Sequence, residues 1–80
     1  SEDLDALRVY PLPVTHHLTI SNTCAFTTYR LVSLTGQEVQ GGSLKEGINN
    51  VDVSHMPAGT YFLSLFGAGK ESRSFTVIHN

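Results

Sequence analysis

Met56-Pro57-Ala58-Gly59-Thr60-Tyr61-Phe62-Leu63 is a tight turn that runs directly into a strand. Pro57 presets φ for the turn, and Gly59 can take the positive φ that most residues avoid. From Thr60 onward the chain is rich in β-branched, aromatic and apolar residues, which is typical of a buried strand with Tyr61 and Leu63 facing the core. Nothing in this stretch has the chemistry of a catalytic motif, so it predicts architecture rather than activity.

Outward from this stretch, the chain consists of short segments with a period of two, separated by turns. Leu18 and Ile20 share one face, and Val51 and Val53 are expected inward with Asp52 outward. Prolines end the first strand, because proline cannot donate to a ladder. The predicted strands are Leu7–Tyr10, His17–Ser21, Phe26–Leu34, Gln37–Gln40, Asn49–Val53, Thr60–Phe66 and Ser72–Ile78.

The spacing of these strands predicts the fold class. Seven short strands about 8–12 residues apart are typical of an all-β, Ig-like antiparallel β-sandwich. Thr35-Gly36 is expected to form a hairpin turn, and Gly41-Gly42 to weaken the polar strand that follows it. That polar strand suits a sheet edge, and its exposed edge at Gln37–Gln40 would support strand-mediated pairing into a homodimer.

Length and composition limit the classes of protein. Eighty residues make one domain, and a net charge of −2 gives no basic face for nucleic acid. No apolar run approaches the roughly 20 residues of a membrane span. Cys24 is the only cysteine, so an internal disulfide is excluded. Residues 1–6 are acidic and polar, unlike a signal peptide, and are expected to be the end of a linker that precedes a domain over residues 7–80.

Catalytic and metal chemistry have little support in the sequence. The four histidines are His16, His17, His55 and His79; they show no ligand spacing and are expected to be solvated or to lie in turns. We therefore expect no metal and no cofactor. Asp52-Val53-Ser54-His55 contains the residue types of a hydrolase triad, but near-consecutive residues are not expected to converge as a triad must. The prediction is a protein that is not an enzyme.

Two further groups of residues have structural interpretations. Gly67-Ala68-Gly69-Lys70 lacks the spacing of a phosphate-binding loop and is interpreted as a hairpin turn. The seven aromatic residues are interpreted mainly as core, the alternative being that a few form an exposed recognition patch. They are Tyr10, Phe26, Tyr29, Tyr61, Phe62, Phe66 and Phe75.

Five blocks, in their order along the chain, are more distinctive than any one of them. They are Val9-Tyr10-Pro11-Leu12-Pro13 with His17-Leu18-Thr19-Ile20 behind it, the segment from Tyr29 to Val39, Gly47 to Ser54, Met56 to Leu63, and a short closing strand. From Leu7 to Ile78 this order resembles the C-terminal sorting domain of cargo proteins of the type IX (Por) secretion system of Bacteroidetes.

The resemblance implies a folded module that passes through the periplasm and is recognised by an outer-membrane translocon. Such a module directs its cargo across the outer membrane to the cell surface or the extracellular space. A sortase-like peptidase usually removes the module, and the cargo is joined to anionic lipopolysaccharide. The resemblance does not distinguish this from a retained domain of an envelope component that binds lipopolysaccharide or partner proteins. A generic Ig-like adhesion or carbohydrate-binding module is a third alternative.

The family motifs also imply which residues carry recognition. The Tyr-Pro-x-Pro block corresponds to Tyr10, Pro11 and Pro13, and the mid-chain glycine turn to Gly36. The remaining correspondences are Pro57, Ala58, Gly59 and Tyr61 for the Pro-Ala-Gly-x-Tyr block, Gly69 and Lys70 for the Gly-Lys hairpin, and Ser74, Phe75, Thr76, Val77 and Ile78 for the last strand.

The chain departs from the family pattern in three places. Leu12 stands where the family often has asparagine, and His16 or His17 where it usually has aspartate. The chain finishes with Val77-Ile78-His79-Asn80, without the basic residues common near the end of the family.

Overall fold

The computed structural model describes residues 7–11, 13–21, 26–69 and 71–80, and within these ranges every regular element is a β-strand. The predicted linker (residues 1–6), Leu12, Cys24 and Lys70 lie outside the described residues. The strands are β1 (Arg8–Tyr10), β2 (His17–Ser21), β3 (Thr28–Ser33), β4 (Glu38–Ser43), β5 (Ile48–Asp52), β6 (Gly59–Phe66) and β7 (Arg73–His79).

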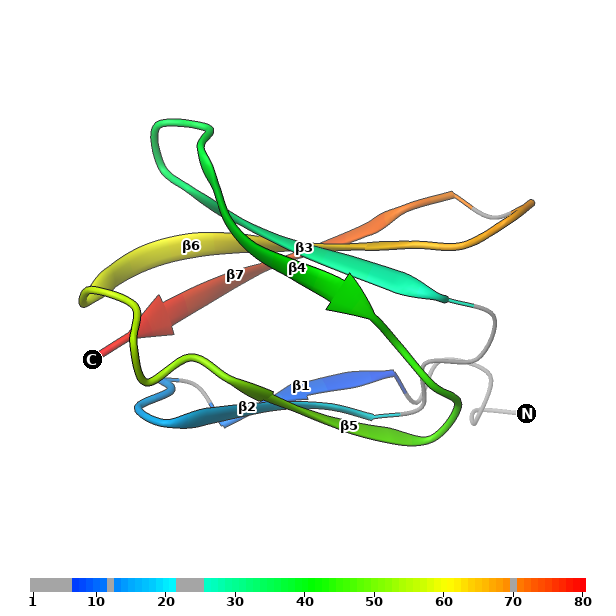
Figure 1. The fold of residues 1–80 in the computed structure, drawn as a ribbon, viewed down its shortest axis with the longest axis horizontal. Helices are drawn as coiled ribbons and strands as arrows, with labels where there is room; N and C mark the ends of the chain where they lie inside the picture. The colour runs from blue at the N-terminus through cyan, green and yellow to red at the C-terminus, as the bar shows by residue number, and fades with distance from the viewer. Residues whose placement is uncertain (1–6, 12, 22–25, 70) are drawn as a thin grey trace.

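The strands form two antiparallel sheets that face each other (Figure 1). One sheet has the order β1-β2-β5, and the other has the order β4-β3-β6-β7. The prediction of an Ig-like sandwich of seven strands is thus confirmed. The fourth strand pairs with β3, whereas in constant-type immunoglobulin domains it extends the sheet of the first, second and fifth strands.

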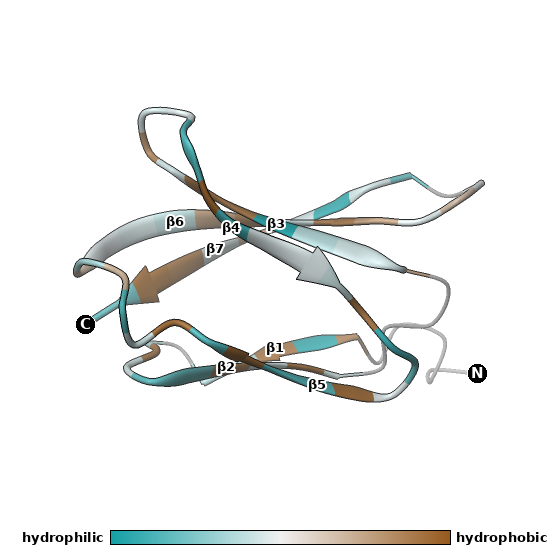
Figure 2. Ribbon diagram, viewed as in Figure 1, coloured by the Kyte–Doolittle hydropathy of each residue, from teal (hydrophilic) through white to brown (hydrophobic). Residues whose placement is uncertain are grey.

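The core lies between the sheets, and buried residues alternate with outward ones along β2, β5, β6 and β7. Leu18, Ile20, Val53 and Leu63 are fully buried, as the period of two predicts. Figure 2 shows this alternation as changes of colour along β1, β2 and β5. The buried apolar residues are Val14, Leu18, Ile20, Phe26, Leu31, Leu44, Val51, Val53, Met56, Tyr61, Leu63, Leu65 and Val77.

β4 does not end before its two glycines, whereas the predicted strand ended at Gln40. The strand continues to Ser43, and the Tyr29 side chain of β3 covers its cross-strand partner Gly42. A Cβ atom on Gly42 would lie 3.0 Å from the Tyr29 ring, so the bare backbone makes room for this contact. The tertiary contact with Tyr29 therefore compensates for the weak strand propensity of glycine.

The predicted turns form where the glycines permit them. Gly36 has φ +91° in the β3–β4 turn, which the bond from the Gly36 amide to the Ser33 carbonyl closes. Gly59 has φ +152° at the first residue of β6, in a region that other residues rarely adopt. No atom lies within 4 Å of a Cβ built on Gly59, so this position requires glycine for its backbone angle and not for space.

Candidate recognition site

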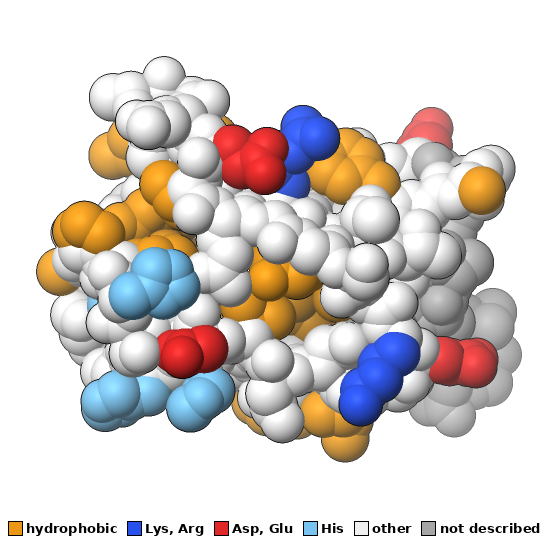
Figure 3. Space-filling view, in the orientation of Figure 1, with side chains coloured by type: hydrophobic (Ala, Val, Ile, Leu, Met, Phe, Trp, Pro, Cys, Tyr) orange, Lys and Arg blue, Asp and Glu red, His pale blue; other side chains and the backbone are white. Residues whose placement is uncertain are grey.

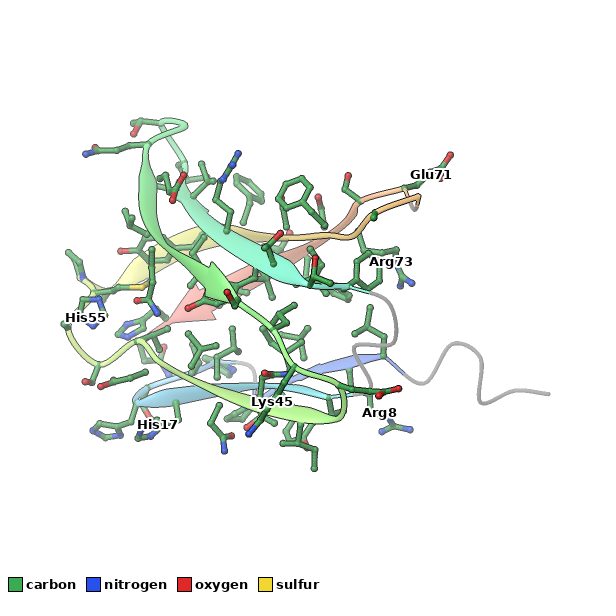
Figure 4. The ribbon with its side chains drawn as sticks, turned by 45° about the vertical axis from the view of Figure 1, so that its right-hand side comes forward. Arg8, His17, Lys45, His55, Glu71 and Arg73 are labelled. Atoms are coloured by element: carbon green, nitrogen blue, oxygen red, sulfur yellow. The ribbon has the colours of Figure 1, made fainter. Side chains whose placement is uncertain are left out.

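One end of the sandwich brings together residues that are far apart in the sequence. We call it the proline end: the described residues among 10–17, together with 52–61 and 78–80. It holds all three prolines and all four histidines of the chain. The opposite end, which we call the loop end, comprises residues 26–27, 44–48, 66–69 and 71–73. In Figure 4, His17 and His55 lie toward one end, and Arg8, Glu71 and Arg73 lie toward the other.

The segment between β1 and β2 crosses from one sheet to the other at the proline end. Tyr10 still pairs with β2, through Thr19. Four residues later, the Val14 amide donates to the Ile78 carbonyl at 2.8 Å, and the Asn80 amide donates to the Val14 carbonyl at 2.9 Å. Val14 is thus a parallel neighbour of the last strand. Pro11 and Pro13 occupy this crossing, where the missing N–H group costs no ladder bond.

The turn before β6 is fixed by the side chain that follows it. The Tyr61 hydroxyl donates to the Pro57 carbonyl four residues upstream, at 2.6 Å. This matches the tyrosine corner of Ig-like sandwiches, where a tyrosine near the start of the sixth strand bonds back to the preceding corner. Tyr61 is buried, so its ring is core while its hydroxyl anchors the Pro57–Gly59 turn.

His79 ties the last strand to the other sheet. Its Nε2 atom lies 2.8 Å from the Val53 carbonyl oxygen, just beyond β5, and its ring meets Tyr61 edge-on at 6.5 Å. A carbonyl only accepts, so Nε2 carries the proton and donates. Nδ1 is buried without a hydrogen-bond partner among the described residues. Four bonds therefore converge on this corner, two at Val14 and one each from Tyr61 and His79.

The expectation that the histidines are solvated is wrong for His79, which is buried. Phe75, Val77 and His79 alternate along β7, and this alternation places all three on the inner face. The same alternation is present in the sequence and could have revealed the buried histidine. His16, His17 and His55 are exposed, as expected.

The Asp52-Val53-Ser54-His55 segment forms a turn that is stabilised by hydrogen bonds within it. The Asp52 carboxylate accepts bonds from the Ser54 hydroxyl at 2.7 Å and from the Ser54 amide at 2.9 Å. These bonds hold the pKa of Asp52 below its usual value, with smaller help from the charges of His17 and His55. Figure 3 shows histidine side chains gathered near an acidic side chain at this end.

The expectation concerned the three residue types of a triad, and two of them, Asp52 and Ser54, meet here. Residues two apart meet here because the chain turns directly after β5. The Ser54 hydroxyl points its proton at Asp52 and not at a histidine base, which a hydrolase triad would require. The pair explains the shape of the turn.

The sequence-predicted recognition residues divide between the two ends. The proline end includes Tyr10, Pro11, Pro13, Pro57, Gly59, Tyr61 and Ile78, with Val77 paired to Tyr61. Gly36 lies in the β3–β4 turn just beyond Ser33, which also pairs with Tyr61. Thr76 pairs with Phe62, so it continues this group along β7.

The remaining predicted residues are not brought to the proline end. Gly69 lies in the β6–β7 hairpin loop with φ +72°, at the loop end, and Ser74 and Phe75 are on the half of β7 nearer this loop. The Gly67–Gly69 segment does connect paired strands, so its interpretation as a hairpin turn is confirmed.

The proline end is suited to contact between surfaces and not to enclosing a small ligand. No pocket opens among the residues that the structure describes. Within the same residues, no group of three histidine, cysteine, aspartate or glutamate side chains is placed to hold a metal ion. The aromatic residues are divided: Phe26 and Tyr61 are core, whereas Tyr10 and Phe62 are about 40% exposed (43% and 39%).

Comparison with known proteins identifies one family. A family model described as the secretion system C-terminal sorting domain matches residues 8–79, which is nearly the whole chain. No curated protein and no solved structure matches the chain at a significant level. In the described residues, no helix has the length and apolarity needed to cross a membrane.

Proposed function

The chain belongs to the family of secretion system C-terminal sorting domains, and we propose that it acts as a folded, non-enzymatic signal that carries an attached cargo protein across the outer membrane. As a type IX sorting domain it directs export to the cell surface or the extracellular space. The finer steps belong to the proposal: transit through the periplasm, recognition by an outer-membrane translocon, removal by a sortase-like peptidase, and attachment of the cargo to anionic lipopolysaccharide.

One observation carries the proposal. Motifs separated by more than sixty residues of sequence meet at the proline end, where the Val14 backbone bonds both Ile78 and Asn80. β7 is thereby held in three ways: by its pairing with β6, by the backbone bonds to Val14, and by the bond from the His79 side chain to Val53. A translocon that reads this end would find its shape only in a domain that has folded to its last residue. Recognition would therefore report complete folding of the signal.

The direct test is export of a passenger. We expect Ser1–Asn80, fused behind a stable passenger with its own periplasmic signal, to bring the passenger to the surface of a type IX-competent cell. Deleting Ser74–Asn80 removes most of β7 and should leave the passenger in the periplasm. The same fusion in a cell without the translocon is the matched control. Surface display that survives the deletion would contradict the proposal.

A second candidate is a retained domain of an envelope component, which binds lipopolysaccharide or a partner protein. The observation that favours it is the departure from the family pattern at Leu12, where the family often has asparagine, and at His16 or His17, where it usually has aspartate. The mass of the mature parent protein on the cell surface separates the two. A mass that includes this domain supports retention, and a mass shortened by it supports removal.

A further inference from the structure

The outer face of β6 and β7 has no charged side chain. Alternation places one residue in two on this face, away from the core. The bond distance of 3.4 Å between the Ser64 and Ser74 hydroxyls confirms that the two strands share it. The outward residues are Thr60, Phe62, Ser64, Phe66, Ser74, Thr76 and Ile78.

Toward the proline end, this face becomes apolar. Phe62 is paired with Val32 of β3 on one side, and Ile78 lies in the neighbouring row, paired with Thr60. Leu34 lies in the turn directly after β3. We call these four residues, Val32, Leu34, Phe62 and Ile78, the Phe62 patch. Three of them are well exposed: Leu34 at 67%, Ile78 at 49% and Phe62 at 39%.

The nearest charges on this face are already paired with each other. Arg30 Nε lies 3.1 Å from Glu38 Oε1, and the Arg30 guanidinium lies 5.3 Å from the centre of the Phe66 ring. The opposite face of the molecule, on the sheet β1-β2-β5, differs. It carries Arg8, His17 and Asp52 at exposed positions. An uncharged apolar patch is therefore specific to one face of the sandwich.

The path of the chain leaves this patch open. Arg8 pairs with Ser21, and Ser21 pairs with Ile48, so β1 starts at the loop end. A passenger joined ahead of β1 would therefore enter at the loop end and on the other sheet. The described part of the chain thus starts away from the Phe62 patch and from the end of β7.

We infer that the Phe62 patch is the docking surface for a protein component of the secretion machinery, one that presents an uncharged, apolar surface of its own. This inference rests on the proposed function, and it names the surface of the signal that the machinery contacts. Exposed apolar patches bordered by polar groups mark sites of protein contact. Anionic lipopolysaccharide is a poorer fit, because the patch offers no free cation to its phosphate groups.

The test uses the passenger fusion with two exposed substitutions in the patch. Phe62→Ser with Ile78→Ser should lower the surface-to-periplasm ratio of the passenger about tenfold, as expected when the anchors of an interface are removed. Ile48→Ser is the matched control, since Ile48 is 59% exposed but lies at the loop end of the other sheet. It should export like the unmodified domain.

A second measurement removes any dependence on how the double variant folds. A photo-crosslinking residue at position 62 of an otherwise unchanged domain should form an adduct with a protein of the translocon, and the adduct should be missing in cells that lack this protein. The same residue at position 48 should not form this adduct.

The outcomes are distinguishable. Adducts at position 48 but not at 62, or adducts at 62 with lipopolysaccharide only, overturn the inference. Normal export by a folded double variant does so too. Failure of the unmodified domain to export its passenger contradicts the proposed function instead.

Discussion

The two ends of this sandwich are held in different ways. At the proline end, bonds cross between segments far apart in sequence: Val14 to Ile78 and Asn80, and His79 to Val53. At the loop end, the described bonds are shorter in range or stay within a sheet. The Asn49 amide group, for example, bonds both backbone groups of Lys45, and the Thr27 amide donates to the Phe66 carbonyl.

This difference shows where the structure depends on its last residues. The bonds named at the loop end do not involve the last residues of the chain. The proline end is complete only when β7 lies between β6 and Val14. The proline end, which carries most of the family motifs, is therefore also the end whose structure depends on the C-terminal strand being in place.

The largest expected difference between the ends is in the free energy of unfolding lost when a tyrosine of each end is replaced by alanine. The two tyrosines, Tyr61 and Tyr29, lie on the same sheet. Tyr61→Ala should lower the free energy of unfolding by about 3–5 kcal/mol, because it removes a buried ring and the bond to Pro57. Tyr29→Ala, in the half of the sheet nearer the loop end, should cost about 1–2 kcal/mol, because Tyr29 is only partly buried. Denaturant unfolding measures both, and equal losses would contradict the comparison.

A smaller effect is expected from the histidine that joins the two sheets. His79→Ala should lower the free energy of unfolding by about 1–3 kcal/mol, since it removes a buried hydrogen bond and ring packing. His55→Ala is the matched control at the same end, where an exposed side chain should change stability by no more than about 0.5 kcal/mol. If the two variants lose the same stability, the bond to Val53 does not hold β7.

The smallest effect is a dependence on acid pH. The Ser54 hydrogen bonds lower the pKa of Asp52 below 3.8, the value for the free side chain. The stabilising contribution of the carboxylate is therefore fully present above the unfolded value, and it is lost as the pH falls through the folded value. Thermal unfolding midpoints should favour the unmodified domain over Asp52→Asn above about pH 5, and the two should converge toward about pH 2. A difference that stays constant with pH would show that the charge of Asp52 is not involved.

The sequence was sufficient to predict the elements of the fold and the faces of most strands. Its alternation placed Leu18, Ile20, Val51 and Val53 in the core, and the structure confirms each. Local sequence patterns gave the wrong end of a strand where a residue of another strand determines the structure. β4 continues through Gly41-Gly42, where the Tyr29 side chain of another strand covers Gly42.

The candidate site was predictable in its parts but not in its assembly. Pro57, Gly59 and Tyr61 stood out as a turn leading into a strand, and the tyrosine hydroxyl does fix that turn. The contacts of Val14 and His79 join positions more than twenty residues apart, and no spacing in the sequence indicates them. The Phe62 patch was indicated only in part, because the alternation that places Tyr61 and Leu63 inward places Phe62 outward but does not show which residues of other strands share its face.

The central claim, that recognition depends on the proline end, is tested most directly by the amount of passenger on the cell surface when each end is altered in the same way. A short glycine-serine segment would be inserted after His55 at the proline end or after Ala68 at the loop end, in variants shown to unfold cooperatively. We expect the insertion after Ala68 to leave surface display nearly unchanged and the insertion after His55 to retain the passenger in the periplasm. Equal display from both variants, or loss only with the insertion after Ala68, would contradict the claim.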